Sequence, residues 1–170
     1  MSSNKGKDGE MRVIKIVADI AIQEEGLDFT RPTVTNESDM GADLMIKSSL
    51  QSLNRLLQVA AGLPQTTDEH GSLKKTIESR VDIKTTQSKL QTDTVEKFAS
   101  DVRKHPKCTG HILIGGSNLT GPAQRKLDQY KDDFAQEGKI LAYISNDGIG
   151  RLESEYAKST SLAPKDSEKD

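Results

Sequence analysis

The chain has 170 residues, a length that suits one domain with a hydrophobic core of useful size. Its formal net charge is −2, which argues against a protein that coats nucleic acid without preference, because such binding needs many basic contacts, but a local basic groove remains possible. No apolar run approaches the roughly 20 residues of a membrane helix, and the start of the chain lacks the apolar stretch of a secretory signal. A single cysteine, Cys108, excludes an internal disulfide, so we expect a cytoplasmic protein with no membrane partner.

Both ends of the chain are polar and poor in large apolar residues. Such segments bury too little apolar surface to offset the entropy lost on ordering. We therefore expect a flexible N-terminal tail at residues 1–9, a folded domain at residues 10–150 and a polar C-terminal tail at residues 151–170.

The first elements follow from the spacing of apolar residues. Residues 11–25 carry them at steps of three and four, which predicts a helix that ends at Gly26. Residues 29–35 are rich in β-branched side chains and predict a strand, residues 36–39 form a turn-like cluster, and residues 43–47 predict a second strand.

Residues 48–77 predict a helical insertion between the second and third strands. Leucine and alanine recur at helical spacing from Leu50 to Ala61, and a polar loop follows at residues 64–71. An apolar stripe of this kind is more often a contact with the core or with a partner helix than a ligand site. We expect a dimer contact at this helix, which is the first surface to test for a homodimer.

The second half of the chain predicts strands that alternate with helices. Residues 80–86 predict the third strand and residues 94–104 a helix. A buried strand at residues 111–116, a helix at residues 122–136 and a strand at residues 139–145 follow, which implies a parallel pair joined by a right-handed crossover. The predicted fold class is α/β, with a mixed central sheet flanked by helices.

Acidic and basic side chains recur on two of these strands. Asp43 lies at the start of the second strand, and on the third strand Asp82 and Lys84 share one face because side chains alternate along a strand. If the two strands are neighbours, two carboxylates and one ammonium group meet in a small volume. Paired carboxylates are costly there unless a divalent cation neutralises them.

Short motifs on these strands resemble the PD-(D/E)XK nuclease superfamily, and within it the Mrr-like restriction endonucleases. The segment from Asp39 to Asp43 resembles the D-x-G-x-D turn and strand of that family, and Asp82-Ile83-Lys84 resembles its (D/E)-x-K element. Residues 110–144 resemble the strand, helix and strand that end the fold. The resemblance therefore implies a restriction-endonuclease-like fold over residues 10–150.

The chain departs from the family pattern in three respects. The acid before Ile83 is aspartate where Mrr-like members commonly have glutamate, and the insertion at residues 48–77 is long. No acid of the first helix aligns clearly with a family position, and Asp19, Glu24 and Glu25 are the choices near the end of that helix.

The resemblance implies a magnesium site, with manganese as a substitute. Asp43, Asp82 and the backbone carbonyl of Ile83 would hold the ion, and Lys84 would stabilise the charge that grows on the phosphate. Asp39 either supports this site or bonds the backbone of its own turn.

Further polar residues are candidates for contacts around that site. Gln87 could hold a water or a phosphate, or be an ordinary surface residue, and Lys89 belongs to a set of basic residues that could line a groove. Ser117 and Asn118 precede a predicted helix and could bind the DNA backbone, although a plain tight turn is the commoner role of such a segment.

The scattered histidines predict no zinc site. His70, His105 and His111 lack metal-ligand spacing with each other or with Cys108.

We therefore expect a Mg²⁺-dependent endodeoxyribonuclease, of restriction type or specific for DNA structure, that acts as a homodimer. A two-fold pair is the simplest way to cut both strands with one centre per chain. The alternative is a non-catalytic module that retains the nuclease fold and binds protein or nucleic acid.

Overall fold

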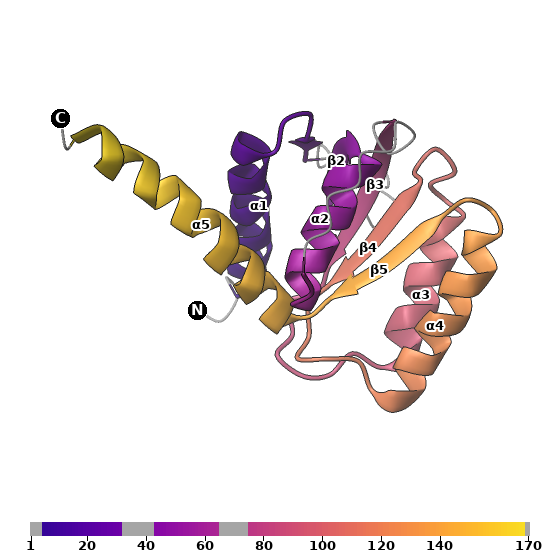
Figure 1. Ribbon diagram of the computed structural model, residues 1–170. Helices are drawn as coiled ribbons and strands as arrows, with labels where there is room; N and C mark the ends of the chain where they lie inside the picture. The colour runs from indigo at the N-terminus through magenta and orange to yellow at the C-terminus, as the bar shows by residue number, and fades with distance from the viewer. Residues whose placement is uncertain (1–4, 32–42, 65–74, 169–170) are drawn as a thin grey trace.

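The computed structural model describes the backbone of residues 5–31, 43–64 and 75–168, and the side chains of residues 8–31, 43–64 and 75–157. Helices and strands follow one another in an α/β order (Figure 1). In chain order they are α1 (Lys5–Gln23), β1 (Asp28–Thr30), β2 (Leu44–Ser49), α2 (Leu50–Ala61), β3 (Thr76–Ile83), α3 (Thr92–Val102), β4 (Gly110–Ile114), α4 (Gly121–Ala135), β5 (Ile140–Ile144) and α5 (Asn146–Glu168).

The strands form one mixed sheet with the order β1-β2-β3-β4-β5. The pairs β1–β2 and β2–β3 are antiparallel, whereas β3–β4 and β4–β5 are parallel and are joined through α3 and α4. The predicted α/β class, the mixed sheet and the parallel last pair are confirmed, and α2 lies between the second and third strands of the sheet as expected.

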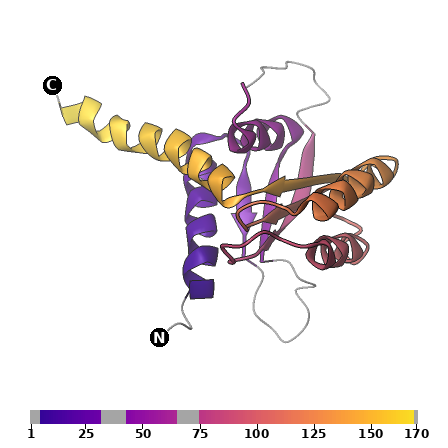
Figure 2. The same ribbon diagram turned by 90° about the horizontal axis from the view of Figure 1, so that it is seen from below.

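Helices cover the sheet in two groups, which the view from below separates clearly (Figure 2). One apolar cluster joins α1, α2 and α5 to residues such as Val81 and Ile112, and the other joins α3 and α4 to Leu113 and Leu141. Because β3 and β4 lie in the middle of the sheet, both of their faces are covered and their residues are buried throughout most of each strand.

The first helix begins earlier than its apolar pattern indicates. We predicted a loose segment at residues 1–9, but α1 begins at Lys5 and passes close to the end of β3. A Cβ atom built on Gly9 would lie 2.9 Å from Cγ2 of Thr85, so glycine permits the close approach. The apolar pattern missed this turn because residues 5–9 contain no apolar side chain.

The leucine-rich helix α2 packs into the core of its own chain. The side-chain oxygen of Ser49 accepts a hydrogen bond from the backbone N–H of Ser52 and caps the first turn. The buried residues of the helix are Ser52, Leu53, Leu56, Val59 and Ala60. Since this stripe faces the sheet, it does not supply the apolar partner surface considered from the sequence.

Residues 151–168, which we expected to belong to a polar tail at residues 151–170, are helical. They belong to α5, whose residues Ile149, Leu152 and Tyr156 are buried against the α1 and α2 side of the core. Three apolar residues at helical spacing carry this packing, and the many charged residues between them hide the pattern in the composition. Arg12 on α1 also forms a two-bond ion pair with Glu153 on α5.

Strand boundaries differ from the predicted ones by several residues. The strand predicted at 29–35 is β1 at Asp28–Thr30, and residues 32–35 lie outside the described part of the chain. The third strand begins before residue 80 and ends at Ile83, before the predicted end at residue 86. None of the helices in the described ranges is long and apolar enough to cross a membrane.

Candidate functional site

The carboxyl ends of β3, β4 and β5 meet at one edge of the sheet, beside the beginnings of α1 and α5 (Figure 1). Backbone hydrogen bonds fix the chain here: Lys84 donates to the carbonyl of Ile114, and Gly115 donates to the carbonyl of Ile144. In open α/β sheets the crevice outside the carboxyl ends of parallel strands is the usual place for a ligand.

Asp43 lies next to the end of β3 because β2 pairs with β3 in antiparallel register. Leu44 is opposite Val81, so the register continues to Asp43 beside Asp82. The backbone N–H of Asp43 donates to the carbonyl of Val81 at 2.9 Å, and its Oδ2 accepts from the backbone N–H of Ile83 at 2.8 Å. Backbone hydrogen bonds therefore fix Asp43 through both its own N–H group and its carboxylate.

Asp82 and Lys84 form an ion pair at the same edge. Nζ of Lys84 lies 3.5 Å from Oδ1 of Asp82, and the two side chains are 35% and 7% exposed. Asp82 points to the sheet face opposite Val81, as the alternation predicts. The structure thus brings together the three residues that the sequence singled out, Asp43, Asp82 and Lys84, around the end of β3.

The electrostatic environment of Asp43 disfavours its negative charge. The pKa of Asp43 is raised to about 6, and burial is the largest cause. The hydrogen bond from Ile83 and the charge of Lys84 act to lower this pKa, whereas the charges of Asp82 and Glu10 act to raise it. An additional cation beside these carboxylates would relieve their repulsion.

Glu10 is a fourth charged residue of the site, and the sequence did not single it out. It lies on α1, its charge acts on Asp43, and its Oε1 pairs with Nη2 of Arg31 at 3.1 Å. The predicted helix began one residue after Glu10, and acids were sought near its other end. A helix start placed one turn earlier would have included this acid.

The helix acids proposed from the sequence lie elsewhere. Asp19 pairs with Lys15 one turn before it, and Glu24 pairs with Arg55 of α2. Glu25 lies in the turn after α1. The end of α1 that reaches the strand ends is its beginning, where Gly9 and Glu10 lie.

The donor set fits a hard divalent cation that keeps most of its water. Two carboxylates, from Asp43 and Asp82, lie beside the backbone of Ile83, and Mg²⁺ is commonly held by one or two carboxylates together with waters and substrate phosphates. Within the described residues, no three side chains of His, Cys, Asp or Glu form a metal-holding group. Such a site would therefore depend on two carboxylates and on oxygen atoms from outside the side chains.

The other predicted contact residues lie at the same edge but not all beside the acids. Gln87 is exposed and lines a small hollow with Lys84, whereas Lys89, Ser117 and Asn118 lie farther along, on two loops. Those loops are bound together, since Ser117 donates to the carbonyl of Ser88 and Leu90 donates to the carbonyl of Asn118. Asp39 lies outside the described residues.

A buried polar network lies behind the acids on the same face of β3. Arg80 is fully buried, donates from Nε to Nδ1 of His111 at 2.8 Å and from Nη2 to the carbonyl of Phe98 at 2.8 Å. His111 faces the carbonyl of Cys108 with its other ring nitrogen. Burial, followed by the charge of Arg80, lowers the pKa of His111 to about 3, so the ring is neutral. This histidine completes a core hydrogen-bond chain.

His105 and Cys108 lie in one turn, where the backbone N–H of Cys108 donates to the carbonyl of His105 at 3.0 Å. His105 bonds the carbonyl of Asp101 through its ring, and Cys108 is buried, with a pKa raised by burial. His70 lies outside the described residues.

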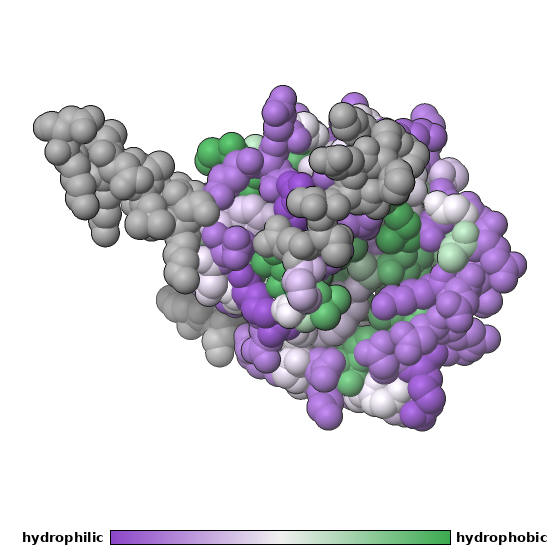
Figure 3. Space-filling model, viewed as in Figure 1, coloured by the Kyte–Doolittle hydropathy of each residue, from purple (hydrophilic) through white to green (hydrophobic). Residues whose placement is uncertain are grey.

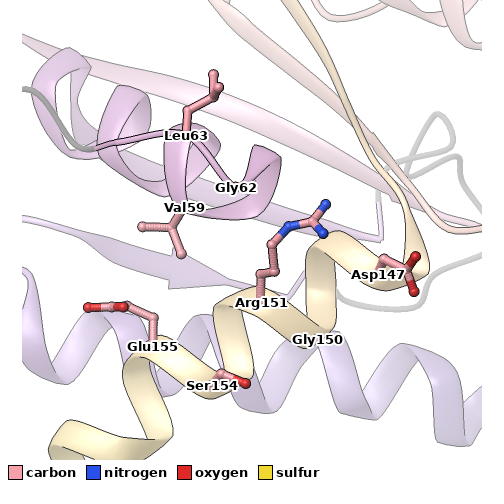
Figure 4. A pocket seen from close by; sticks show the side chains of 8 residues that line it. All are labelled: Val59, Gly62, Leu63, Asp147, Gly150, Arg151, Ser154 and Glu155. Atoms are coloured by element: carbon pink, nitrogen blue, oxygen red, sulfur yellow. The ribbon is translucent and has the colours of Figure 1, made fainter.

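Wider grooves occur away from the acids. One of about 640 Å³ lies between the end of α2 and α5, where Arg151 reaches toward α2 and donates to the carbonyl of Ala60 at 2.8 Å (Figure 4). A second, of about 340 Å³, lies between α2 and α4, where hydrophobic side chains come to the surface (Figure 3). Neither is lined by Asp43, Asp82 or Lys84.

No protein-family model matches this chain, and no curated protein matches its sequence. The functional proposal therefore rests on the geometry of the site.

Proposed function

We propose that this protein is a Mg²⁺-dependent endodeoxyribonuclease with a restriction-endonuclease-like fold. The observation that supports it most is the meeting of Asp43, Asp82 and Lys84 at the end of β3, where two carboxylates share one small region with an ammonium group. The motif resemblance of these residues to the PD-(D/E)XK superfamily agrees with the chemistry that such a group can perform.

In this proposal the two aspartates bind the cation and Lys84 stabilises the charge on the phosphate. Asp43 and Asp82 hold the cation together with the carbonyl of Ile83, and the bound Mg²⁺ supplies a Lewis acid for the phosphate and the attacking water. Lys84 keeps its ammonium beside Asp82 and faces the charge that develops on the phosphate, which is the most effective position for electrostatic stabilisation.

Glu10 takes the role of the acid contributed by a helix. Its charge already acts on Asp43 in the folded chain. Glu10 would accept hydrogen bonds from waters on a bound cation, because Mg²⁺ retains several waters in protein sites.

DNA is the proposed substrate, and two chains are proposed to act together. Lys89, Ser117 and Asn118 are exposed at the same edge of the sheet and are available to phosphates on either side of the cleaved one. A two-fold pair of chains cuts both strands with one centre each. The buried stripe of α2 is not its interface, so the pair would use other surfaces.

The test is cleavage of plasmid, linear duplex and branched DNA with Mg²⁺ or Mn²⁺. Wild-type protein is expected to cut at least one of these substrates, and Asp82→Ala to cut none. A matched control is Asp133→Asn, which changes an exposed acid of α4. Cleavage that persists in Asp82→Ala would remove the mechanism, and the absence of any cleavage by wild type would remove the function.

A further inference from the structure

A small hollow lies immediately beyond Lys84 and is distinct from the acid cluster. Its polar lining comes from several elements: Arg12 of α1, then Lys84, Thr85 and Gln87 after β3, and Asn146, the first residue of α5. Its walls are completed by apolar residues and by the backbone of Gly9 and Gly115. Close packing of α1 against the end of β3 therefore builds it.

The hydrogen-bond donors of this lining suit an anion, although Arg12 also pairs with Glu153 and Lys84 with Asp82. Every polar side chain named above can donate hydrogen bonds, two carry a positive charge, and none of the residues that line the hollow is Asp or Glu. The guanidinium of Arg12 uses two of its nitrogens on Glu153 but has five N–H donors in all. The side-chain amide of Asn146 donates a long hydrogen bond of 3.4 Å to the carbonyl of Thr86, which is easily exchanged for a better acceptor.

The size of the hollow selects a small anion. Its volume is about 50 Å³, and one water needs about 10–15 Å³ on a comparable measure. A phosphate group, with four oxygens around one phosphorus, occupies about as much room as four waters on that measure, whereas a nucleobase or a sugar is too large. The volumes of the other two grooves, about 640 and 340 Å³, do not restrict a ligand to this small size.

We propose that this hollow is a phosphate subsite that holds a second phosphate of the nucleic-acid strand whose scissile phosphate lies at Asp82 and Lys84. The inference rests on the proposed nuclease function and deepens it. Lys84 borders both places, so the two phosphates belong to one strand. The second phosphate is either an internal diester next to the cleaved one or the monoester at a 5′ end.

Contacts of this kind position the strand without reading its bases. Gln87 and Asn146 would contribute neutral donors to the phosphate, and Arg12 and Lys84 its counter-charge. The subsite would fix the position of the cut relative to the backbone, whatever the sequence.

The test measures binding of duplex oligonucleotides by fluorescence anisotropy in Ca²⁺, with single phosphates replaced in turn by neutral methylphosphonates. A second arm compares 5′-phosphate with 5′-hydroxyl ends. Wild type is compared with Gln87→Ala, Asn146→Ala and the double variant, and Gln136→Ala, an exposed glutamine at the end of α4, is the matched control. Circular dichroism verifies that each variant is folded.

One methylphosphonate is expected to weaken binding by wild type and by Gln136→Ala about fivefold. It is expected to weaken the double variant by a smaller factor, because that variant has lost two donors to this phosphate but keeps Arg12 and Lys84. If removal of the 5′-phosphate gives this pattern instead, the subsite holds a terminal monoester. Equal losses in wild type and in the double variant at every position would overturn the subsite while the nuclease stands. A wild type that neither binds nor cuts DNA would instead overturn the proposed function.

Discussion

Two parts of β3 carry buried charged groups, and they differ in the kind of partner that surrounds those groups. In its middle, Arg80 donates two hydrogen bonds and lies 4.8 Å from the ring centre of Phe98, and its partner His111 bonds at both ring nitrogens. At its end, Asp43 and Asp82 lie side by side, with a single ion pair to Lys84 and an increased pKa at Asp43.

We interpret this difference as one between a structural role and a proposed chemical role. Arg80 makes two hydrogen bonds within the chain although its buried Nη1 has no partner, and its removal would leave the ring of His111 and the carbonyl of Phe98 without a donor. At the strand end, the half-buried Asp43 and the buried Asp82 lie beside the partly exposed Lys84, where we propose that a cation binds. We therefore expect substitutions in the middle of β3 to affect stability and those at its end to affect activity.

The largest expected effect is on activity. Asp82→Asn keeps the shape of the side chain and removes a proposed cation ligand, so we expect cleavage to fall at least about 10³-fold. The free energy of unfolding should change by less than about 1 kcal/mol. Single-turnover cleavage and urea unfolding of the same preparation check both statements. A variant that is inactive because it is unfolded would contradict the separation of roles.

Arg80→Met is expected to have the largest effect on stability. It removes the donors to His111 and to the carbonyl of Phe98 from a fully buried site, so we expect a loss of about 3–5 kcal/mol in urea unfolding. Lys131→Met, a change at the rim of the groove between α2 and α4, is the control and should cost less than about 1 kcal/mol. Equal losses in the two variants would show that the Arg80 network contributes little.

The loss of stability at acidic pH is expected to depend on His111. Its folded pKa of about 3 lies below the ordinary 6.5, so between these values the unfolded chain binds a proton that the folded chain does not. Stability from this group is complete above about pH 6.5 and is lost as the pH falls toward 3, by up to about 4 kcal/mol. Urea midpoints from pH 7 to 4 should fall less steeply in His111→Gln than in wild type. Parallel profiles would contradict a neutral buried histidine.

The smallest effect is expected at Asp43, whose contribution to stability falls as the pH rises, opposite to that of His111. The folded pKa of about 6 exceeds the ordinary 3.8, so the folded chain binds the proton more tightly and loses stability as the pH rises through this window. Asp43→Asn removes that cost, and without a divalent cation it should be about 1–2 kcal/mol more stable than wild type at pH 7.5. Addition of Mg²⁺ should reverse the order. A less stable variant in EDTA would contradict the electrostatic account.

The sequence predicted the sheet, most of the helices and three residues that come together, because period-2 and period-3.6 patterns report which faces are buried. It could not predict the beginning of α1, where the absence of a side chain at Gly9 permits a close approach to Thr85. It also could not predict α5, because the apolar residues of that helix are sparse. Glu10 was missed for the same reason, since its role arises from tertiary packing. The hollow beyond Lys84 combines residues from distant parts of the chain, which no local pattern brings together.

The most direct measurement of the central claim is titration of the metal-free protein with Mg²⁺ and Mn²⁺ by calorimetry, for wild type, Asp43→Asn, Asp82→Asn and the control Asp133→Asn. We expect wild type and Asp133→Asn to bind the ion alike, and both other variants to bind it at least about tenfold more weakly, because each loses one of two carboxylate ligands. Equal affinity in all four proteins, or no binding by any of them in the presence or absence of DNA, would contradict a shared cation site at the end of β3.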